Sequence, residues 1–469
     1  MVKREGRRFA PLLLSLCFLQ AAKPPTSLST GFPEFQNPMK TLRSLILVSL
    51  VAFTGVLFAQ TSPLPPKPQA PPKPVPTIPQ TPIPPAPQPN AQAWVLMDYA
   101  NGQILASSNM DQRRAPASLT KIMTEYVVNA ELAAGKIHMD DPVHISEHAW
   151  RAGGAGTDGS TSFLKLNSDV PLKDLLYGMI IQSGNDAAIA LAEHVAGSEQ
   201  AFAQMMNAYA QRLGMTGTHF INASGYPAPD HYSTAHDIAI LSRALIKHFP
   251  EEYKISKIKA FEWNGITQHN RNTLLWTDPT VDGIKTGSTK EAGFCLAASA
   301  LRDGMRLIAV TMGGPDMNAA TTGDEALLNW GFNFYRTHDL YKAGQVLATP
   351  RLWKGEADTL ELGIAEDASV TIPRGRYDQL QATLEIPQRL VAPFKQGQQV
   401  GTLKVTFDGK PLVTEPLVVL KDAPQGGFFK RLWDAILLWF HHGNGTTTTP
   451  APTVSVSPAA SVAPPATAK

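Results

Sequence analysis

Cysteine is almost absent from this chain, because Cys17 and Cys295 are the only two among its 469 residues. Two cysteines exclude a disulfide framework, a cysteine-ligated zinc finger and an iron–sulfur cluster. An excess of one charge is also missing, since 41 Lys and Arg stand against 39 Asp and Glu. This balance argues against a basic nucleic-acid-binding surface. We therefore expect no nucleic-acid partner, no metal site and no cofactor.

Proline is scarce in the middle of the chain and abundant in its flanks. Of 39 prolines, 14 lie between Pro63 and Pro89, and only 15 lie across residues 93–442. Residues 60–92 are predicted to be a polyproline II linker, acting either as a spacer or as a solvated segment of no selected length. Residues 443–469 are rich in Thr, Pro, Ala and Ser and are predicted to be a disordered tail. The sequence between these flanks is long enough for two folded domains.

The first 59 residues are typical of a targeting segment. A methionine at position 39 and a short basic stretch precede an apolar run over residues 45–58, which ends before the small residue Ala59. This pattern predicts a secretory signal peptide that starts at Met39 and follows an upstream over-read. Cleavage after Ala59 and retention as an uncleaved anchor both fit the pattern.

Residues 425–442 are predicted to form an amphipathic membrane-anchor helix. Apolar pairs recur every four residues and so share one helical face: Phe428 and Phe429, Leu432 and Trp433, Ile436 and Leu437, then Phe440. A helix of this length spans roughly 25 Å, which is too short to cross a bilayer. We expect residues 428–440 to lie on the surface of a membrane. The alternative is a helix that docks on the core of its own protein.

The middle of the chain has the pattern of a mixed α and β protein. Strands are expected at both ends of residues 93–342, with helices between them, which predicts one sheet of sequence-distant strands carrying a helical insertion. The predicted strands are 94–99, 294–301 and 306–312, and the predicted helices are 118–130, 172–181, 186–195, 200–213, 236–248 and 324–335. Short strands dominate residues 343–424, which predicts a small all-β domain. The fold class is therefore α/β (α+β).

A serine and a lysine three residues apart are the first candidate catalytic pair. Ser118 and Lys121 would lie on the same face of a helix, where a partly buried lysine beside another cation can act as the base for a serine nucleophile. Two other matches exist, at residues 162–165 and 256–259. Only Ser118 opens an amphipathic helix, right after Pro116 and Ala117, so this match is the preferred one.

Two further motifs follow this pair in the chain. Ser183 and Asn185 flank a glycine in a break between helices, and Lys285, Thr286 and Gly287 lead into a predicted strand. Serine-x-x-lysine, serine-x-asparagine and lysine-threonine-glycine, in this order, resemble the signatures of the penicillin-binding protein and serine β-lactamase superfamily. Cys295 lies just after the last motif and is expected to be a core residue and not a nucleophile.

The resemblance extends to the low-molecular-mass penicillin-binding proteins, the D-alanyl-D-alanine carboxypeptidases. It covers about residues 93–440 and rests on the segments 179–188, 219–225, 270–276 and 281–287. It implies a transpeptidase-like catalytic domain, a C-terminal β domain and a C-terminal membrane anchor. The implied partners are peptidoglycan stem peptides, β-lactam antibiotics and the inner-membrane surface, and the implied location is the periplasm.

The resemblance also implies roles for the motif residues. Ser118 attacks the carbonyl between the two D-alanines and forms an acyl-enzyme, and Lys121 takes its proton. Ser183 relays that proton toward the leaving amine, and Asn185 holds the substrate amide. The backbone N–H groups of Ser118 and Ser288 form the oxyanion hole.

The terminal carboxylate of the substrate has a second set of implied partners. Lys285 attracts this carboxylate and keeps the neighbouring lysine partly neutral, while Thr286 and Gly287 line the site. Ser288 stands where many relatives have histidine, and residues 315–323 lack the arginine that many relatives carry there. Arg271 is a candidate substitute in carboxylate binding, or an ion-pair partner.

Three alternatives remain beside the carboxypeptidase. A DD-endopeptidase would use the same residues. A weak class A-like β-lactamase would share the motifs, but its glutamate-x-x-leucine-asparagine element is absent between Ser183 and Lys285. A low-activity peptidoglycan-binding protein would be expected to have lost Ser118 or Lys121, and both are present.

Overall fold

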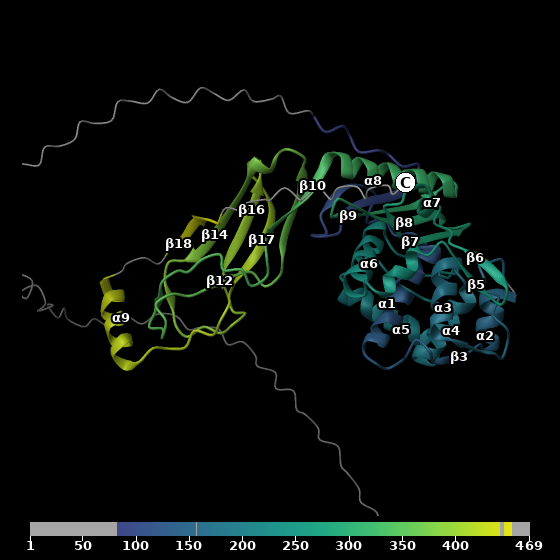
Figure 1. Cartoon of the computed structure of the whole chain (residues 1–469), viewed down its shortest axis with the longest axis horizontal. Coiled ribbons are helices and arrows are strands. Elements are labelled where there is room, and N and C mark those ends of the chain that lie inside the picture. Colours follow the sequence, from purple (N-terminus) through teal and green to yellow (C-terminus); the bar gives the residue numbers. More distant parts are fainter. Residues whose placement is uncertain (1–81, 156, 441–444, 453–469) are drawn as a thin grey trace, which may run out of the picture. The chain divides into compact units, whose positions relative to one another are not determined.

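A computed structural model describes residues 82–155, 157–440 and 445–452 of the chain. The predicted signal peptide, Cys17 and most of the predicted linker and tail lie outside these residues. The described residues form a mixed α and β domain followed by a smaller β domain (Figure 1). This architecture confirms the predicted fold class.

The first domain is built on a five-stranded antiparallel sheet whose strands come from both ends of the domain, as predicted. The strand order is β2-β1-β9-β8-β7. The strands are β1 (Ala93–Asp98), β2 (Ile104–Ser108), β7 (Val281–Thr289), β8 (Gly293–Arg302) and β9 (Met305–Gly314). The order brings the lysine-threonine-glycine motif on β7 to one edge of the sheet.

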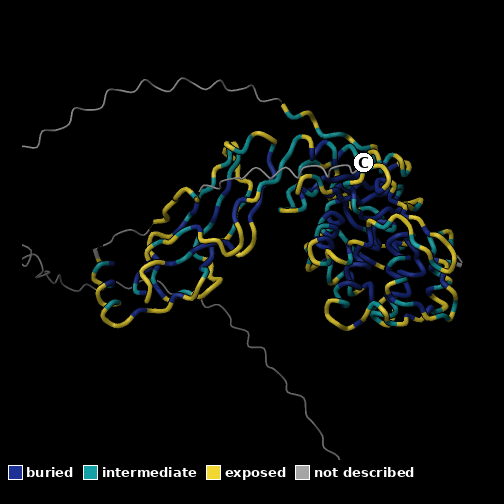
Figure 2. Tube along the Cα trace, viewed as in Figure 1, coloured by how far each residue is buried: buried dark blue, intermediate teal, exposed yellow. Residues whose placement is uncertain are grey.

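Both faces of this sheet are covered, so its central strands are apolar on both sides. Along β1, Val95 and Met97 pack into the large core around the helical insertion, while Trp94 and Leu96 pack under α8 (Met317–Phe334) on the other face. Figure 2 shows the interior of this domain in the dark blue of buried residues. Complete burial of β1 follows from this arrangement of layers.

The helical insertion lies between β2 and β7 and contains short strands and turns besides helices. Ser198 and Thr234 begin two of its helices as N-caps, since their side chains accept hydrogen bonds from the backbone N–H groups of Ala201 and Asp237. Its elements are η2 (Ala117–Leu119), α1 (Thr120–Ala133), β3 (Pro142–His144), α2 (Glu147–Trp150), η3 (Arg151–Ala155), β4 (Asp169–Pro171), α3 (Leu172–Tyr177), η4 (Gly178–Gln182), α4 (Asn185–Ala196), α5 (Glu199–Arg212), α6 (Ala235–His248), η5 (Glu252–Lys257), β5 (Ala260–Trp263), β6 (Ile266–His269) and α7 (Leu274–Thr277).

Two helix starts differ from the prediction. Ser118 lies in the 3-10 turn η2 and not in the first turn of α1, which begins at Thr120. Helix α8 begins earlier than predicted because the Asp316 side chain accepts a hydrogen bond from Ala319 N at 2.7 Å and so provides its N-cap.

The second domain has a five-stranded sheet of order β12-β17-β16-β14-β18 and two small two-stranded sheets, β10-β13 and β11-β15. Its core is a separate apolar cluster that includes Leu340, Val370 and Leu403. Its elements are β10 (Tyr335–Tyr341), β11 (Leu352–Trp353), β12 (Leu362–Gly363), β13 (Ala368–Pro373), η6 (Tyr377–Gln379), β14 (Leu380–Pro387), β15 (Leu390–Val391), β16 (Gln399–Phe407), β17 (Lys410–Val419), α9 (Phe428–Phe440) and β18 (Thr446–Pro450).

The boundary between the two domains lies earlier than the predicted division at residues 342 and 343. Strand β10 pairs with β13 from Tyr335 to Tyr341, and Tyr341 packs in the core of the β domain. The prediction placed these residues in the first domain because the run of short strands was recognised only beyond about residue 345. The pairing places the change of domain at the end of α8.

Both flanks are more ordered near the folded domains than the sequence predicted. In the predicted linker, Ile83 and Ala86 pack against the cluster under α8, and Trp330 Nε1 donates a hydrogen bond to Pro84 O at 3.0 Å. In the predicted disordered tail, β18 pairs antiparallel with β14. Consecutive β-branched threonines suit a strand, and the edge of β14 supplies its partner.

Candidate active site

The nucleophile candidate Ser118 lies in a turn with unusual backbone geometry. Ala117, directly before it, has a left-handed φ of 48°, and Gly225 packs against this residue with a φ of 82°. A Cβ atom on Gly225 would lie 1.8 Å from the Ala117 carbonyl oxygen. Only glycine fits this approach, so the loop that contains Gly225 fixes the turn that presents Ser118.

Lys121 lies one helical turn after Ser118 and is almost completely buried. Its Nζ atom is 3.2 Å from Ser118 Oγ, 2.6 Å from Asn185 Oδ1 and 2.6 Å from Ser224 O. A neutral amine has two N–H donors, which the Asn185 and Ser224 oxygens accept. Its remaining lone pair then faces the hydroxyl of Ser118, which is the geometry of a general base.

The electrostatic surroundings favour this neutral form of Lys121. Burial lowers the pKa of Lys121 well below its ordinary value, and the positive charges of Lys285 and Arg271 lower it further, against the opposing effect of Asp186 and Glu199. The ordinary pKa of lysine would leave it protonated at neutral pH. The lowered pKa lets Lys121 accept the proton of Ser118.

Ser183 and Asn185 lie at the junction of η4 and α4, as the sequence predicted for a break between helices. Ser183 has a left-handed φ of 70° and is buried, and its Oγ atom has no hydrogen-bond partner among the residues that the structure describes. Asn185 contacts two neighbouring segments. Its backbone N–H donates to Ser160 O at 2.8 Å, and its Oδ1 accepts a hydrogen bond from Lys121 Nζ. The structure thus joins Asn185 directly to the Ser118–Lys121 pair, whereas no hydrogen bond joins Ser183 to it.

Asp186 follows this motif and was not singled out from the sequence. Its carboxylate accepts hydrogen bonds from Thr161 Oγ1 at 2.7 Å, Ser162 N at 2.8 Å and Leu164 N at 3.2 Å. One carboxylate therefore fixes the loop that lies across the start of α4. Nothing in the local sequence distinguishes this aspartate from an ordinary residue in the first turn of a helix.

The two competing serine-lysine matches do not form catalytic pairs. Ser162 and Ser256 are buried, but Lys165 and Lys259 are exposed. Neither lysine is therefore enclosed in the protein, whereas Lys121 is buried next to Ser118.

The lysine-threonine-glycine motif on β7 lies against the turn that carries Ser118. A Cβ atom on Gly287 would lie 2.8 Å from Ser118 N, so this strand approaches the turn at backbone distance. Lys285 and Thr286 are buried, and Ser288 is exposed and pairs with Phe294 of β8. The fold thus places this motif beside Ser118, although more than half of the first domain separates the two in the sequence.

Lys285 also has a strongly lowered pKa. Burial and the neighbouring charge of Arg271 lower the pKa of Lys285 to about 7, while Glu125 opposes this shift. Arg271 is therefore within electrostatic reach of both Lys285 and Lys121. The next residue, Asn272, connects this segment to β7, because its Nδ2 donates to Gly283 O at 2.9 Å.

Cys295 lies opposite Gly287 in the β7–β8 pairing and is buried. Burial raises the pKa of its thiol to about 11, which keeps it protonated. The prediction of a core residue is confirmed.

The sequence did not predict that a backbone carbonyl, that of Ser224, would accept a hydrogen bond from Lys121. His231 fixes the loop that contains Ser224 to α1, because its Nδ1 accepts from Ile221 N at 3.2 Å and its Nε2 lies 2.9 Å from Thr120 Oγ1. Burial first, and then the charges of His219 and Lys121, lower the pKa of His231 to about 4, so the ring is neutral. The signal in the sequence is the turn-forming run Asn-Ala-Ser-Gly that ends at Gly225.

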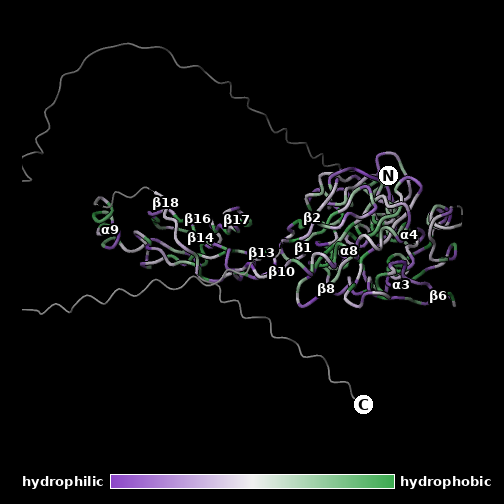
Figure 3. The backbone as a smooth tube through the Cα atoms, turned by 90° about the horizontal axis from the view of Figure 1, so that it is seen from above, coloured by the Kyte–Doolittle hydropathy of each residue, from purple (hydrophilic) through white to green (hydrophobic). Residues whose placement is uncertain are grey.

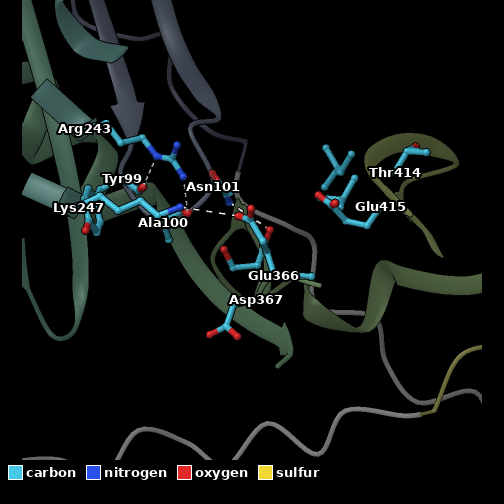
Figure 4. Close-up of a pocket in the computed structure, with 13 residues that line it drawn as sticks. Tyr99, Ala100, Asn101, Arg243, Lys247, Glu366, Asp367, Thr414 and Glu415 are labelled. Carbon is cyan, nitrogen blue, oxygen red and sulfur yellow. Dashed lines mark hydrogen bonds and ion pairs between the residues drawn. The ribbon is translucent and has the colours of Figure 1, made fainter. Parts of the chain in front are cut away.

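A separate crevice of about 750 Å³ lies away from this pair and is lined by the turn after β1, by α6 and by strands of the β domain. Arg243 and Lys247 point into it, and Arg243 is held by the carbonyls of Tyr99 and Ala100 (Figure 4). Its lining contains none of the motif residues. Within the described part of the chain, no cluster of three or more His, Cys, Asp or Glu side chains could hold a metal ion.

Comparison with known proteins agrees with this geometry. Residues 80–316 match the family model described as D-alanyl-D-alanine carboxypeptidase, and residues 335–425 match the model of the C-terminal domain of penicillin-binding protein 5. The chain belongs to the D-alanyl-D-alanine carboxypeptidase family. It is therefore a serine carboxypeptidase of the low-molecular-mass penicillin-binding proteins, as the motifs predicted.

Named relatives support this assignment over most of their length. D-alanyl-D-alanine carboxypeptidase DacC of Escherichia coli is 47% identical over 361 residues, which cover 76% of this chain and 90% of the relative. DacA of the same organism is 44% identical over the same share of both chains. The crystal structure of penicillin-binding protein 5 from Haemophilus influenzae is 43% identical, with a TM-score of 0.70, and the match covers 72% of this chain and 99% of that one.

Proposed function

We propose that the enzyme removes the terminal D-alanine of peptidoglycan stem peptides through an acyl-enzyme on Ser118. The carrying observation is the set of three contacts of Lys121, which leaves its lone pair for the Ser118 hydroxyl. Ser118 Oγ attacks the carbonyl between the two D-alanines while its proton passes to Lys121. The C–N bond then breaks, and Ser183 relays the proton to the departing D-alanine amine.

Binding of the substrate is assigned to the residues around this pair. The backbone N–H groups of Ser118 and Ser288 stabilise the oxyanion, and each such donor is typically worth about 3 kcal/mol in the transition state. Asn185 holds the amide of the substrate. Lys285 and Arg271 attract its terminal carboxylate.

Thr286 and Gly287 line the carboxylate site, and Ser288 takes the place of the histidine found in many relatives. Water then hydrolyses the acyl-enzyme and releases the shortened peptide. β-Lactams acylate Ser118 by the same attack.

The experiment is incubation of residues 80–440 with a pentapeptide that ends in D-Ala-D-Ala, beside a Ser118→Ala control and a fluorescent penicillin. Release of D-alanine and labelling of the protein that both depend on Ser118 are expected. Absence of both would contradict the proposal, and cleavage of a cross-linked dimer in place of the pentapeptide would favour an endopeptidase.

We further propose that α9 attaches the enzyme to the outer surface of the cytoplasmic membrane. The proposal is supported by the two faces of this helix, which carries both hydrophobic and hydrophilic residues in Figure 3. Asp434 is buried and accepts from Lys354 N at 2.6 Å, and Lys430 Nζ donates to Asp358 Oδ1 at 2.7 Å. The opposite face exposes large apolar side chains: Phe428, Phe429, Leu432, Trp433 and Ile436.

Polar contacts thus hold one face of α9 to the β domain, and the apolar face points away from it. An apolar face of this size suits the boundary between lipid headgroups and acyl chains. No helix in the described ranges is long and apolar enough to span a bilayer. A periplasmic location and export by the predicted signal peptide belong to the same proposal, and sequencing the N-terminus of the mature protein tests cleavage after Ala59.

A further inference from the structure

Strand β7 carries the lysine-threonine-glycine motif at the edge of the first sheet, and one residue interrupts its regular pairing. In the described part of the chain, β8 is the only strand that pairs with β7. Val281 lies opposite Ala300, whereas Gly283 already lies opposite Ser299. Asp282 is therefore an extra residue in β7, which makes this point a β-bulge.

The bulge decides which face of the sheet the motif presents. With the bulge, Lys285 lies opposite Ala297, which packs in the core around the helical insertion, on the Ser118 side of the sheet. Without the extra residue, Lys285 would lie opposite Leu296, which packs under α8 on the other face. Paired residues share a face of a sheet and successive side chains alternate between faces. The bulge therefore places Lys285 on the side of the nucleophile.

An ion pair that reaches across the sheet holds Asp282 at the bulge. Arg306 of β9 donates from Nη1 to Asp282 Oδ1 and from Nη2 to Asp282 Oδ2, both at 2.7 Å. The same Nη1 donates to Ser299 Oγ at 2.6 Å. Ser299 is the residue of β8 at which the pairing shifts. One guanidinium thus binds both strands at the bulge, and its two parallel bonds fix the position of the carboxylate.

Two further contacts fix the same point from the helical insertion. The Tyr253 hydroxyl on η5 donates to Asp282 Oδ1 at 2.8 Å. A Cβ atom on Gly283 would collide with this hydroxyl, so only glycine allows the approach. Asn272 Nδ2 donates to Gly283 O at 2.9 Å. Both the side chain and the backbone of the bulge are therefore held.

We propose that Asp282 is a positioning residue of the carboxypeptidase, which holds the bulge in β7 and so aligns Lys285 with Ser118. Its carboxylate acts on the reaction only through the strand that follows it. The mechanism needs this alignment because Lys285 attracts the substrate carboxylate and the N–H of Ser288 stabilises the oxyanion. This inference rests on those proposed roles.

The test is the rate of acylation by a fluorescent penicillin, measured with the wild type and with Asp282→Asn. Asparagine keeps the size of the side chain, but it removes the charge and one of the two oxygen acceptors for Arg306. The bulge is then held less firmly, and the rate constant of acylation is expected to fall at least about tenfold. The rate constant is taken per labelled molecule, because misfolded protein takes up no label.

The release of D-alanine from the pentapeptide gives a second readout. Because β7 supplies both the carboxylate site and one oxyanion donor, KM is expected to rise and kcat to fall together in Asp282→Asn. A merely structural role would lower the amount of protein that takes up label. It would leave the acylation rate constant, KM and kcat per labelled molecule unchanged.

Asp278→Asn is the matched control. Asp278 Oδ2 accepts from Arg302 Nη2 at 2.6 Å, and these side chains are 13% and 24% exposed, against 25% and 14% for Asp282 and Arg306. This ion pair also binds the segment of β7 to β8, but it lies before the bulge. We expect a comparable fall in melting temperature and an acylation rate constant equal to that of the wild type.

Tyr253→Phe keeps the test decisive if Asp282→Asn folds poorly. Phenylalanine removes one hydrogen bond to Asp282 and leaves the ion pair with Arg306 in place. Its acylation rate constant is expected to fall at least about threefold, because the bulge loses one of its contacts.

A wild-type rate constant in Asp282→Asn would overturn the inference, and so would an equal loss in Asp278→Asn. If Asp282→Asn yields no labelled protein, a wild-type rate constant in Tyr253→Phe would overturn it instead. Failure of the proposed function has a different signature. In that case the wild type itself takes up no label, or it carries the label on a residue other than Ser118.

Discussion

At the scale of single residues, catalysis depends on where protons lie among closely spaced cations. Lys121, Lys285 and Arg271 would repel each other if all were protonated, and the burial of the two lysines increases that repulsion. The structure resolves this conflict by lowering the pKa of both lysines. This favours a neutral amine at Lys121, next to Ser118, while Lys285 titrates near neutral pH and is proposed to bind the substrate carboxylate in its cationic form.

The pH dependence of kcat/KM follows from these two lysines. In the proposed mechanism, activity requires Lys121 without its proton and Lys285 with its proton, so protonation of Lys121 sets the acid limb and deprotonation of Lys285 sets the basic limb. Because the pKa of Lys285 is about 7, the basic limb is expected near neutral pH and not near the ordinary pKa of lysine. A rate profile measured from pH 5 to 10 checks this, and a flat profile up to pH 10 would contradict it.

Gly225 gives a prediction about the geometry of the nucleophile. In Gly225→Ala the new Cβ would meet the Ala117 carbonyl, so the turn that carries Ser118 must move. We expect a loss of at least about tenfold in the rate of acylation by penicillin, because small displacements of reacting groups are costly. Stopped-flow measurement with a fluorescent penicillin provides the rate.

The matched control is Gly214→Ala. Gly214 has a φ of 78°, close to that of Gly225, but a Cβ there would meet nothing within 4 Å. It carries only the backbone cost of a left-handed alanine, about 1 kcal/mol, and no change in the acylation rate is expected. Equal rates for both variants would argue against a role of the Gly225 contact.

At the scale of elements, α8 covers one face of the first sheet and contains a buried carboxyl group. Asp324 is fully buried, and burial raises its pKa well above the ordinary value. The folded state therefore binds this proton more tightly than the unfolded state does. The stability that this proton contributes is fully present below the unfolded pKa near 4 and is lost as the pH rises.

Asp324→Asn is expected to raise the melting temperature, because an amide of the same size needs no proton to stay neutral. This increase in melting temperature is expected to be absent near pH 4 and to grow toward pH 8. Thermal unfolding of the two proteins at both pH values measures it. A gain that is equal at both values, or a loss at pH 8, would contradict the account.

Helix α9 gives a prediction about membranes. Replacing Phe429 and Trp433 by glutamate places two charges on its exposed apolar face without touching the contacts of Asp434 and Lys430. We expect binding to vesicles of anionic phospholipid to fall at least tenfold, since charged side chains are costly at this boundary. Cosedimentation of residues 80–440 with the vesicles measures it.

Leu412→Glu serves as the control for this experiment, because Leu412 is an exposed apolar residue of the β domain outside α9. Its vesicle binding is expected to equal that of the wild type. Unchanged sedimentation of the double variant would contradict the role of α9, and an equal loss in the control would point to a nonspecific effect of charge.

At the scale of the whole molecule, the sequence predicted most of the catalytic site because its residues occur in three short motifs. Ser118, Asn185 and Gly287 each lie at the end of an element or at a close approach between elements, and such positions leave a local pattern. The order of the motifs and their resemblance to a known family identified both the fold and the chemistry.

The parts that the sequence did not predict depend on contacts between distant segments. The acceptor for Lys121 in the loop before Gly225 is a backbone carbonyl, and any residue type supplies one. Asp186 is an ordinary helix residue until the fold places the loop at 161–164 against it. The motifs therefore specify the reacting groups, whereas their electrostatic support comes from tertiary structure.

The flanks show the same limit. Proline and threonine content predicted unstructured chain on both sides of the folded domains. The prediction failed where the fold offers a partner, which is Trp330 for the segment before β1 and the edge of β14 for β18. A low-complexity segment cannot form a core of its own, but contacts with a neighbouring domain can still order it.

In the proposed mechanism Ser118 is the nucleophile and Lys121 is its base. Intact-protein mass spectrometry after a short incubation with penicillin, followed by peptide mapping, tests it most directly. We expect one adduct, located on Ser118, which is absent in Ser118→Ala and forms far more slowly in Lys121→Met. An adduct on another residue, or one that forms at the wild-type rate in Lys121→Met, would contradict it.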